Sequence, residues 1–312
     1  MNVERIGNRG YIFDFNEYET TLTDTIVYGI KGETYFFICD TQTGPNTMKY
    51  VLDYLKYEII DRRIVVFNSH ADWDHIWGNC IFDKNSVIIS SEACREDILF
   101  KGEYDLKYNY DFINGDVVLK LPDITFESKL FFDSESIEFF YLPGHTIGDS
   151  VCFDKKDRIM YIGDLAEVPI PCIGYHDLKR FKSSLECLLD YDDVIYLTTH
   201  SKIVDKSLIM QNIDYIESLI KGKDISSKII EEYPDVVNID KINRINVLMD
   251  ELIENEKIKK KDGEDFDLFE FELSVFKDMG YTDLKKVDHN FLINLDYDEF
   301  KKFIINKIKK GL

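Results

Sequence analysis

Four potential metal ligands lie within six residues of one another in segment 68–79. They are His70, Asp72, Asp74 and His75. Alternate residues of an extended loop point the same way, so the first three can converge, and His75 can join them where a helix begins. Imidazoles and carboxylates are the ligands of hydrolytic metal sites. A polar, solvated loop is the plain alternative, but two His and two Asp at this spacing favour a metal site.

Three further candidate ligands also follow apolar strands, as the first four follow the strand predicted at 63–67. They are His145, Asp164 and His200, after the strands predicted at 137–142, 158–162 and 194–197. Each could be a turn residue on its own account. Side chains that leave one rim of a sheet are, however, how α/β and related folds assemble their sites. The shared pattern therefore predicts that all seven residues meet in one site.

The elements that position these side chains follow from hydrophobic periodicity. Apolar, β-branched and aromatic runs predict further strands at 25–30, 34–38, 86–90, 129–132 and 150–153. Helical spacing predicts helices at 48–59, 92–100, 178–190 and 203–219, and Asp177 is expected to cap the third of them. Segment 101–123 is rich in Tyr, Asp and Asn and is predicted to be a long irregular surface loop, a candidate cover for the site.

The chain changes character near residue 222. Beyond it the sequence is charged and amphipathic, with helices predicted at 242–259, 268–279 and 299–309. Amphipathic faces need a partner surface, so this segment is expected to pack on the preceding domain, on itself or on a second copy. We predict two units, residues 1–222 and residues 223–312, and a homodimer through the C-terminal helices.

Composition narrows the possible partners. The chain of 312 residues is 45% hydrophobic and 14% aromatic, which supports a large core. Its net charge of -21 argues against nucleic acid and against an anionic membrane surface, which leaves a small-molecule substrate as the expected partner. The 6 cysteines form no CxxC pair, which predicts reduced thiols in a cytoplasmic protein. Neither a signal peptide nor a membrane span is expected.

Taken together, these motifs resemble those of the metallo-β-lactamase superfamily over about residues 20–220. The family's first motif is His-x-His-x-Asp-His, followed by a His after Pro-Gly, a Gly-Asp and a final His. The matching stretches here are His70 to His75, Pro143-Gly144-His145, Gly163-Asp164 and His200. The resemblance implies an α/β (α+β) fold, a four-layer αββα sandwich that carries the C-terminal helical extension. Residues 1–222 would then be the catalytic domain.

The resemblance also implies a dinuclear centre with two divalent metal ions, zinc by family. Its ligand sets would be His70, Asp72 and His145 on one ion and Asp74, His75 and His200 on the other, with Asp164 bridging both. The implied activity is hydrolysis of an ester, thioester, lactone or related small molecule by a metal-bridging hydroxide. Asp74 would be the catalytic residue that orients this nucleophile. Asp40 is either the family's supporting acidic residue or a turn former.

Position 72 departs from the family, because Asp stands where His is usual. A hard anionic oxygen in place of an imidazole makes manganese or iron plausible ions, and three carboxylates with one hydroxide would balance two divalent ions. One alternative function follows, since flavodiiron proteins share the fold, carry a carboxylate at this position and reduce O2 or NO. Their carboxylate is typically Glu, however, and no flavodoxin-like alternation follows residue 222. The second alternative is a non-catalytic metal-binding module.

Residues around the motifs give the expected substrate contacts. Segments 101–123 and 165–176 would select the substrate. Trp73 and Trp77 either pack around the first motif or line an apolar pocket. Tyr175 either packs or donates to a developing oxyanion. His176 and His289 are expected at the surface.

Overall fold

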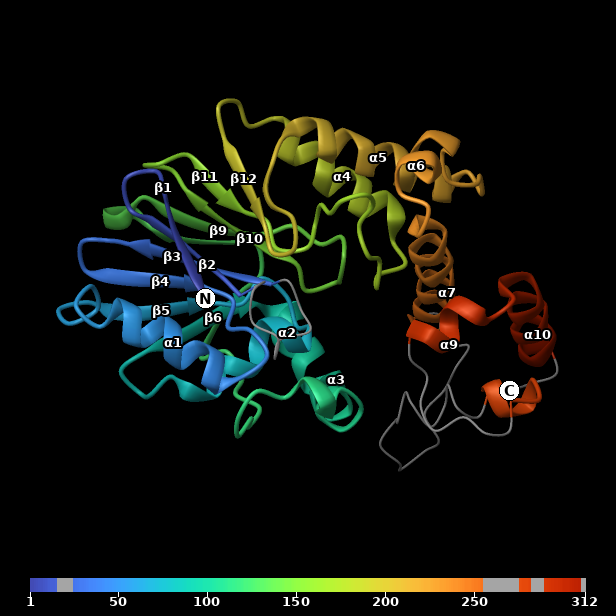
Figure 1. Ribbon diagram of the computed structural model, residues 1–312, viewed down its shortest axis with the longest axis horizontal. Coiled ribbons are helices and arrows are strands. Elements are labelled where there is room, and N and C mark those ends of the chain that lie inside the picture. The colour runs from blue at the N-terminus through green and yellow to red at the C-terminus, as the bar shows by residue number, and fades with distance from the viewer. Residues whose placement is uncertain (16–24, 255–274, 282–288, 310–312) are drawn as a thin grey trace.

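The computed structural model describes residues 1–15, 25–254, 275–281 and 289–309. Two β-sheets pack face to face at its centre (Figure 1). The first has seven strands in sequence order: β1 Asn2–Ile6, β2 Gly10–Asp14, β3 Ile26–Lys31, β4 Tyr35–Cys39, β5 Arg63–Phe67, β6 Val87–Ser91 and β7 Ile124–Phe126. Strands β1 to β4 form antiparallel pairs, and β4 to β7 are parallel.

The second sheet has six strands in the order β13-β12-β11-β10-β9-β8. They are β8 Lys129–Phe132, β9 Ile137–Tyr141, β10 Ser150–Asp154, β11 Ile159–Tyr161, β12 Ile195–Thr198 and β13 Lys202–Val204. Only the β11–β12 pair is parallel. A parallel pair needs a long crossover, and the helix α4 Leu178–Leu189 supplies it.

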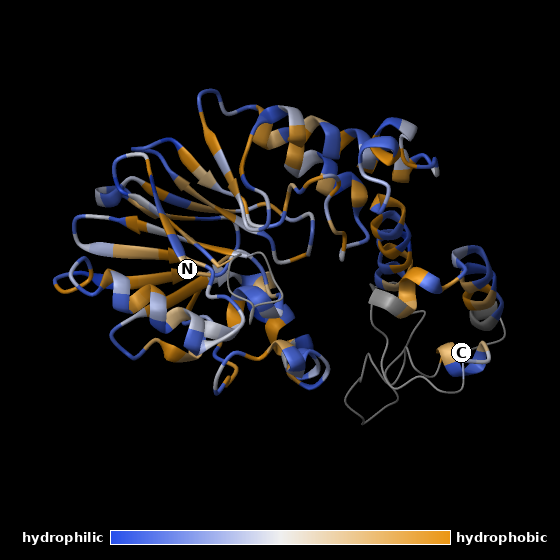
Figure 2. Ribbon diagram, in the orientation of Figure 1, coloured by the Kyte–Doolittle hydropathy of each residue, from blue (hydrophilic) through white to orange (hydrophobic). Residues whose placement is uncertain are grey.

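Helices cover the outer face of each sheet. Helix α1 Pro45–Leu55 lies on the first sheet, and α4 and α5 Lys206–Ile220 lie on the second (Figure 1). Strand β4 shows why both faces are buried, since Phe37 and Cys39 face the other sheet while Phe36 and Ile38 face α1. Figure 2 accordingly shows apolar colour along most of the strands and a striped pattern on these helices. The result is the predicted four-layer αββα sandwich.

Most predicted elements are present within one or two residues, and Asp177 caps α4 by accepting a hydrogen bond of 3.0 Å from the Arg180 N–H. The prediction for 92–123 was wrong in part. Helix α3 runs Glu92–Tyr108, so residues 101–108 are helical and not a loop. Its second half lacks an apolar repeat and contains Gly102, a poor helix former. Hydrophobic periodicity therefore gave no sign that the helix continues. Gly102 allows close packing, since a Cβ there would stand 2.9 Å from a methyl group of Leu119.

The prediction of a helix at 203–219 was wrong at its start. Residues 203 and 204 belong to strand β13, and the helix itself begins at Lys206. Helix α2 Trp73–Ile76 contains Asp74 and His75, the last two residues of the first ligand motif. Three short 3₁₀ turns follow along the chain: η1 Trp77–Ile81, η2 Tyr110–Phe112 and η3 Asp133–Glu135.

The described residues after 222 are helical, as predicted. They form α6 Ser227–Glu232, α7 Val236–Glu254, α9 His289–Asn294 and α10 Tyr297–Lys309. The predicted helix 242–259 therefore begins earlier, and its last residues lie outside the described ones, as does most of 268–279.

This helical segment packs in two places. Ile225 and Val236 are buried in the same apolar cluster as α4 and α5. Farther along the chain, Ile245, Phe276 and Phe300 belong to a separate cluster of the C-terminal helices. The amphipathic faces are thus covered by the domain and by one another, so they do not require a second copy, and the homodimer stays a prediction.

No helix in the described part of the chain is both long enough and apolar enough to cross a lipid bilayer.

Candidate metal centre

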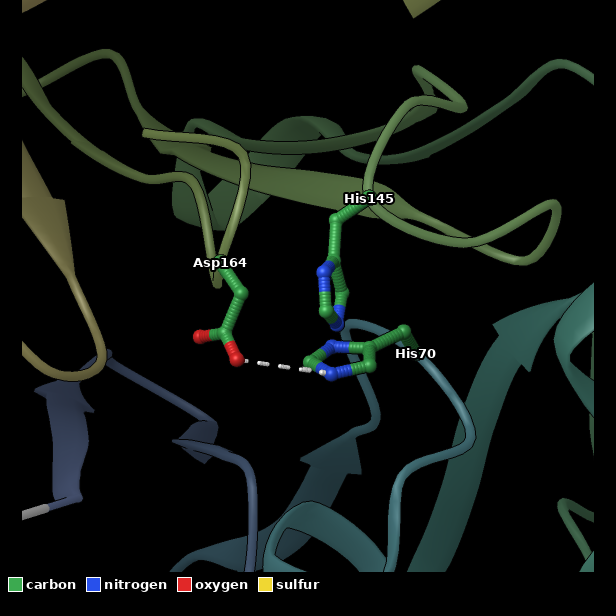
Figure 3. Close-up of side chains that lie close together, drawn as sticks. All are labelled: His70, His145 and Asp164. Carbon is green, nitrogen blue, oxygen red and sulfur yellow. Dashed lines mark ion pairs between the residues drawn. The ribbon is translucent and has the colours of Figure 1, made fainter. Parts of the chain in front are cut away.

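The seven candidate ligands meet where the two sheets share an edge. His70 and Asp72 lie between the end of β5 and helix α2, and Asp74 and His75 lie in the first turn of α2. His145, Asp164 and His200 follow β9, β11 and β12. Figure 3 shows His70 approaching from one side, with His145 and Asp164 approaching from the other. The predicted convergence of strand ends is therefore present in the structure.

The first group of side chains is His70, His145 and Asp164, all buried. One ligand atom from each lies within 4.8 Å of the other two. His70 Nε2 stands 3.7 Å from Asp164 Oδ2, the ion pair drawn in Figure 3. A cation at the centre of such a triangle would be within reach of all three atoms.

The second group is Asp74, His75 and His200, whose ligand atoms also lie within 4.8 Å of one another. Asp164 Oδ2 is 3.3 Å from His75 Nε2 and 3.2 Å from His200 Nε2. Asp164 therefore contacts members of both groups and stands in the position predicted for a bridging carboxylate. The metal-binding role of these residues stays a prediction.

Three buried polar atoms indicate that the site fits metal ions. His70 Nε2, His75 Nε2 and Asp164 Oδ1 make no hydrogen bond with any residue that the structure describes. Leaving such atoms unsatisfied in a protein interior costs free energy. Divalent ions with imidazole and carboxylate preference would satisfy them. The donor set therefore fits two divalent ions, one in each group.

Asp40 holds the two histidines of the first motif. Its Oδ2 lies 2.8 Å from His75 Nδ1 and accepts a hydrogen bond of 2.6 Å from Ser69 Oγ. Ser69 Oγ in turn lies 2.9 Å from His70 Nδ1. Because a carboxylate and a hydroxyl oxygen can accept here, both rings are set to carry their proton on Nδ1 and to turn Nε2 toward the site.

The same carboxylate also ties the two sheets together. Asp40 accepts from Tyr161 Oη at 2.7 Å and from the Ser69 N–H at 2.8 Å. Its own backbone has φ 60, a left-handed conformation that Asp adopts more readily than most residues. Asp40 is therefore more than a turn former, since it supports the candidate ligands.

His145 is held from a different direction. Its Nδ1 lies 2.8 Å from the carbonyl oxygen of Cys172, which can only accept. The carbonyl oxygen of His145 itself accepts from the Gly174 N–H at 2.8 Å. The loop 165–176 therefore fixes the ring of His145, and it turns Nε2 toward the site.

Asp72 lies at the outer side of the first group. Its Oδ2 is 3.1 Å from His145 Nε2 and 3.6 Å from His70 Nε2. Its Oδ1 is 2.6 Å from the ammonium of Lys101, which also pairs with Asp97 at 3.2 Å. One carboxylate oxygen thus faces the site while the other faces a cation.

Lys101 is a residue of the site that the sequence prediction missed. It lies on α3 in the stretch predicted as a loop, one turn after Asp97 and one turn before Asp105. The Asp97-Lys101 spacing is that of an ion pair on a helix, and this signal is readable only once the helix is known to continue past Phe100.

Electrostatics of the site favour cations. Burial lowers the pKa of His75, but Asp164, Asp74 and Asp40 outweigh it and hold this pKa well above its ordinary value. For His200 burial also lowers the pKa, and the nearby carboxylates, Asp164 foremost, raise it to about 9. Burial raises the pKa of Asp164, yet His75 and His200 hold it well below the ordinary value. The raised pKa values of His75 and His200 favour protons on these two rings, so metal binding there must displace protons.

The aromatic residues near the first motif pack on one another. Trp77 is buried, with its ring 5.2 Å from that of Trp73, which lies 4.7 Å from Phe112. This supports the packing interpretation for Trp77. Tyr175 packs edge-on at 5.1 Å against His176. His176 is only partly at the surface, since its side chain is 26% exposed and its Nδ1 lies 2.7 Å from Asp250. The side chain of His289 lies outside the described residues.

Comparisons with known proteins agree with the fold. Solved structures with the same fold include a metallo-beta-lactamase from Pontibacter korlensis, 18% identical with a TM-score of 0.55, which covers 69% of this chain and 98% of its own. TMB-1 is 17% identical with a TM-score of 0.56, over 70% of this chain and 98% of its own. A double mutant of the sec-alkyl sulfatase PisA1 is 15% identical with a TM-score of 0.57, over 70% of this chain and 42% of its own.

No curated protein gives a significant match to the chain. The model of the metallo-beta-lactamase superfamily, in contrast, matches residues 22–200, more than half of the sequence. This span contains all seven candidate ligands. The chain therefore belongs to the metallo-β-lactamase superfamily.

Proposed function

We propose that the protein is a dinuclear metal-dependent hydrolase that acts on an ester, thioester, lactone or related small molecule. One observation carries this proposal: two groups of three candidate ligands adjoin at Asp164, and Nε2 of His70 and Nε2 of His75 are buried without a hydrogen bond among the described residues. Two divalent ions in such a site supply an activated water and polarise the bond under attack.

The residues would divide the work as follows. His70, His145 and Asp72 would hold one ion and Asp74, His75 and His200 the other, with Asp164 between them. Asp74 Oδ1 lies 3.8 Å from His75 Nε2 and Asp74 Oδ2 lies 3.9 Å from His200 Nε2. A carboxylate in this position can bind through one oxygen and accept a hydrogen bond from the attacking water through the other. Asp74 is thus our candidate catalytic residue.

The partner we propose is a small molecule, because the net charge of -21 disfavours polyanions. Chemistry at the metal centre fits carbonyl and phosphoryl electrophiles alike, so the substrate must be chosen by the surrounding side chains. Zinc is the ion expected from the family. Manganese and iron remain candidates because Asp72 offers a hard oxygen.

The test is metal analysis of the purified protein together with hydrolysis assays on a small ester, thioester, lactone and phosphodiester panel. We expect hydrolysis of at least one class, its loss on chelation and its return with the metal. His70→Ala should reduce turnover by several orders of magnitude without unfolding the domain, which circular dichroism can verify. Near-wild-type turnover by His70→Ala would refute the assignment.

Asp72 also supports a second candidate, a diiron oxidoreductase acting on O2 or NO. A carboxylate at this position suits iron. The described residues after 222, however, form helices and no strand, so they include no flavodoxin-like unit that could deliver electrons. A coloured iron centre that consumes O2 under reducing conditions, without hydrolysis, would favour this candidate over the hydrolase.

A further inference from the structure

The loop 165–176, which fixes the ring of His145, is itself held by two buried asparagines. Asn212 on α5 accepts from the Glu167 N–H at 2.9 Å and donates to the Glu167 carbonyl at 3.1 Å. Asn243 on α7 accepts from the Ile173 N–H at 2.9 Å and donates to the Pro171 carbonyl at 2.9 Å. Each asparagine therefore pairs with one N–H and one carbonyl of the loop backbone, as a neighbouring strand would.

Asn243 holds the peptide groups on both sides of Cys172. The carbonyl of Cys172 is the group that lies 2.8 Å from His145 Nδ1. This carbonyl and the Ile173 N–H belong to one planar, rigid peptide unit, so a shift of the Ile173 N–H would also move the carbonyl. The path from α7 to the candidate ligand thus has two hydrogen-bonded steps, the first from Asn243 to the loop and the second from the loop to His145.

The position of Asn243 is well defined in its turn. Its side chain is fully buried, with 0% exposure. Its Nδ2 also donates to Tyr215 Oη at 3.0 Å, and Tyr215 Oη lies 3.0 Å from Asp240. Seven residues farther along α7, Asp250 accepts from the His176 N–H at 2.6 Å. A buried amide with all its partners in place is a rigid support, and it would be costly to maintain if it only packed.

We infer that helix α7 is part of the metal centre, with Asn243 as a positioning residue that fixes His145 through the Cys172 carbonyl. The inference rests on the proposed metal centre but not on its substrate. Helix α7 begins at Val236, beyond residue 200 where the match to the superfamily ends. The C-terminal extension is therefore a structural component of the ligand set and not an appended module.

The experiment compares zinc affinity and stoichiometry in full-length wild type and Asn243→Leu by chelator competition. Partners that orient a ligand typically contribute 10- to 100-fold to metal affinity. We expect Asn243→Leu to lose about that factor for one zinc ion and to bind the other as wild type does. Asn246→Leu makes the same chemical change one turn along α7 and should leave both ions unchanged.

A double-mutant cycle separates positioning from general destabilisation. His145→Ala should weaken the same ion as Asn243→Leu, and the combined variant should lose no more than His145→Ala alone. Full additivity, or equal weakening of both ions, would overturn the inference. So would wild-type affinity in a folded Asn243→Leu protein. Should Asn243→Leu not fold, Asn243→Ala, which removes both hydrogen bonds to the loop without adding bulk, decides by the same criterion. Failure of the proposed function looks different, because wild type itself would then bind no zinc, manganese or iron. A wild type that binds metal while Asn243→Leu binds it equally well refutes the inference alone.

Discussion

The two sides of the metal centre are supported in different ways. Asp40 supports His70 and His75. It follows strand β4 and contacts His75 directly and Ser69, the residue before His70. His145 is backed by a loop that α7 holds from outside the sandwich. The difference teaches that one part of the candidate ligand set is supported within residues 22–200, which match the family model, while the other is also held by a helix beyond them.

The largest effect is expected from Asp164, which belongs to the first group and also contacts His75 and His200 of the second. Asp164→Ala removes a carboxylate from both, so both ions should bind poorly and turnover should fall by several orders of magnitude. Elemental analysis after dialysis is the measurement. A variant that retains two ions per chain would show that Asp164 does not connect the two sides.

A substitution of Asp40 tests the side of the candidate metal centre that contains His70 and His75. In Asp40→Ala, buried groups of Ser69, His75 and Tyr161 lose their acceptor, which should cost about 2–4 kcal/mol of unfolding free energy. Both ions should bind about 10- to 100-fold more weakly, because His70 and His75 belong to different groups. Urea unfolding and chelator competition give the two numbers. Asn243→Leu is the contrasting variant, and loss of only one ion in Asp40→Ala would erase the difference between the two sides.

Asp72 and Lys101 modify the charge argument made from the sequence. Three carboxylates and one hydroxide would neutralise two divalent ions, but the ammonium of Lys101 at 2.6 Å from Asp72 adds a positive charge. The Asp72–Lys101 pair thus has the formal charge of the neutral His that is usual in the family. We therefore expect Asp72 to alter ion preference through its hard oxygen more than through net charge.

The corresponding prediction concerns ion selectivity. Asp72→His should bind zinc more tightly, by about tenfold, and discriminate less in favour of manganese or iron(II), while it still holds two ions. The measurement is metal content after anaerobic equilibration with equal concentrations of the three. Asp72→Ala should lose chiefly the ion beside His70 and His145. Identical metal contents in wild type and both variants would exclude Asp72 as a ligand.

The smallest effect is a pH dependence of the metal-free protein. The pKa of His200 is raised to about 9 in the folded state, against about 6.5 when unfolded. Its protonated form therefore stabilises the fold fully below about pH 6.5, and this contribution is lost as the pH rises through about 9. After allowance for solvent screening we expect a loss of about 1–3 kcal/mol, visible in urea unfolding at pH 6 to 10. With metal bound this loss at high pH should be absent, because the ion takes the place of the proton on the ring. A flat profile without metal would contradict the prediction.

Much of the fold could be predicted because its strands are short, apolar and separated by clear turns. Strand β5 and helix α4 are examples, since period and cap both agree with the tertiary environment. The candidate ligands could be predicted because they follow strand ends, and sheets bring strand ends together. The second half of α3 could not be predicted, since packing of Gly102 against Leu119 and not local propensity defines it.

The supports of the ligands were harder to predict. Lys101 depends on the unexpected part of α3, and Asn243 is a single polar residue in a helix about 70 positions away from the loop that it holds. Its neighbours Ile242 and Ile245 indicate a buried face, but nothing in the sequence indicates which backbone groups meet that face. Such long-range hydrogen bonds become visible only once the fold is known.

The central claim is that two ions lie on either side of Asp164. The most direct measurement is an anomalous difference map, recorded at the absorption edge of the metal, from a crystal of the metal-loaded protein. The account predicts two peaks about 3.5–4 Å apart, as in other two-metal sites. One should lie beside His70 and His145 and the other among Asp74, His75 and His200. A single peak remote from Asp164, or none with the metal present in excess, would contradict it.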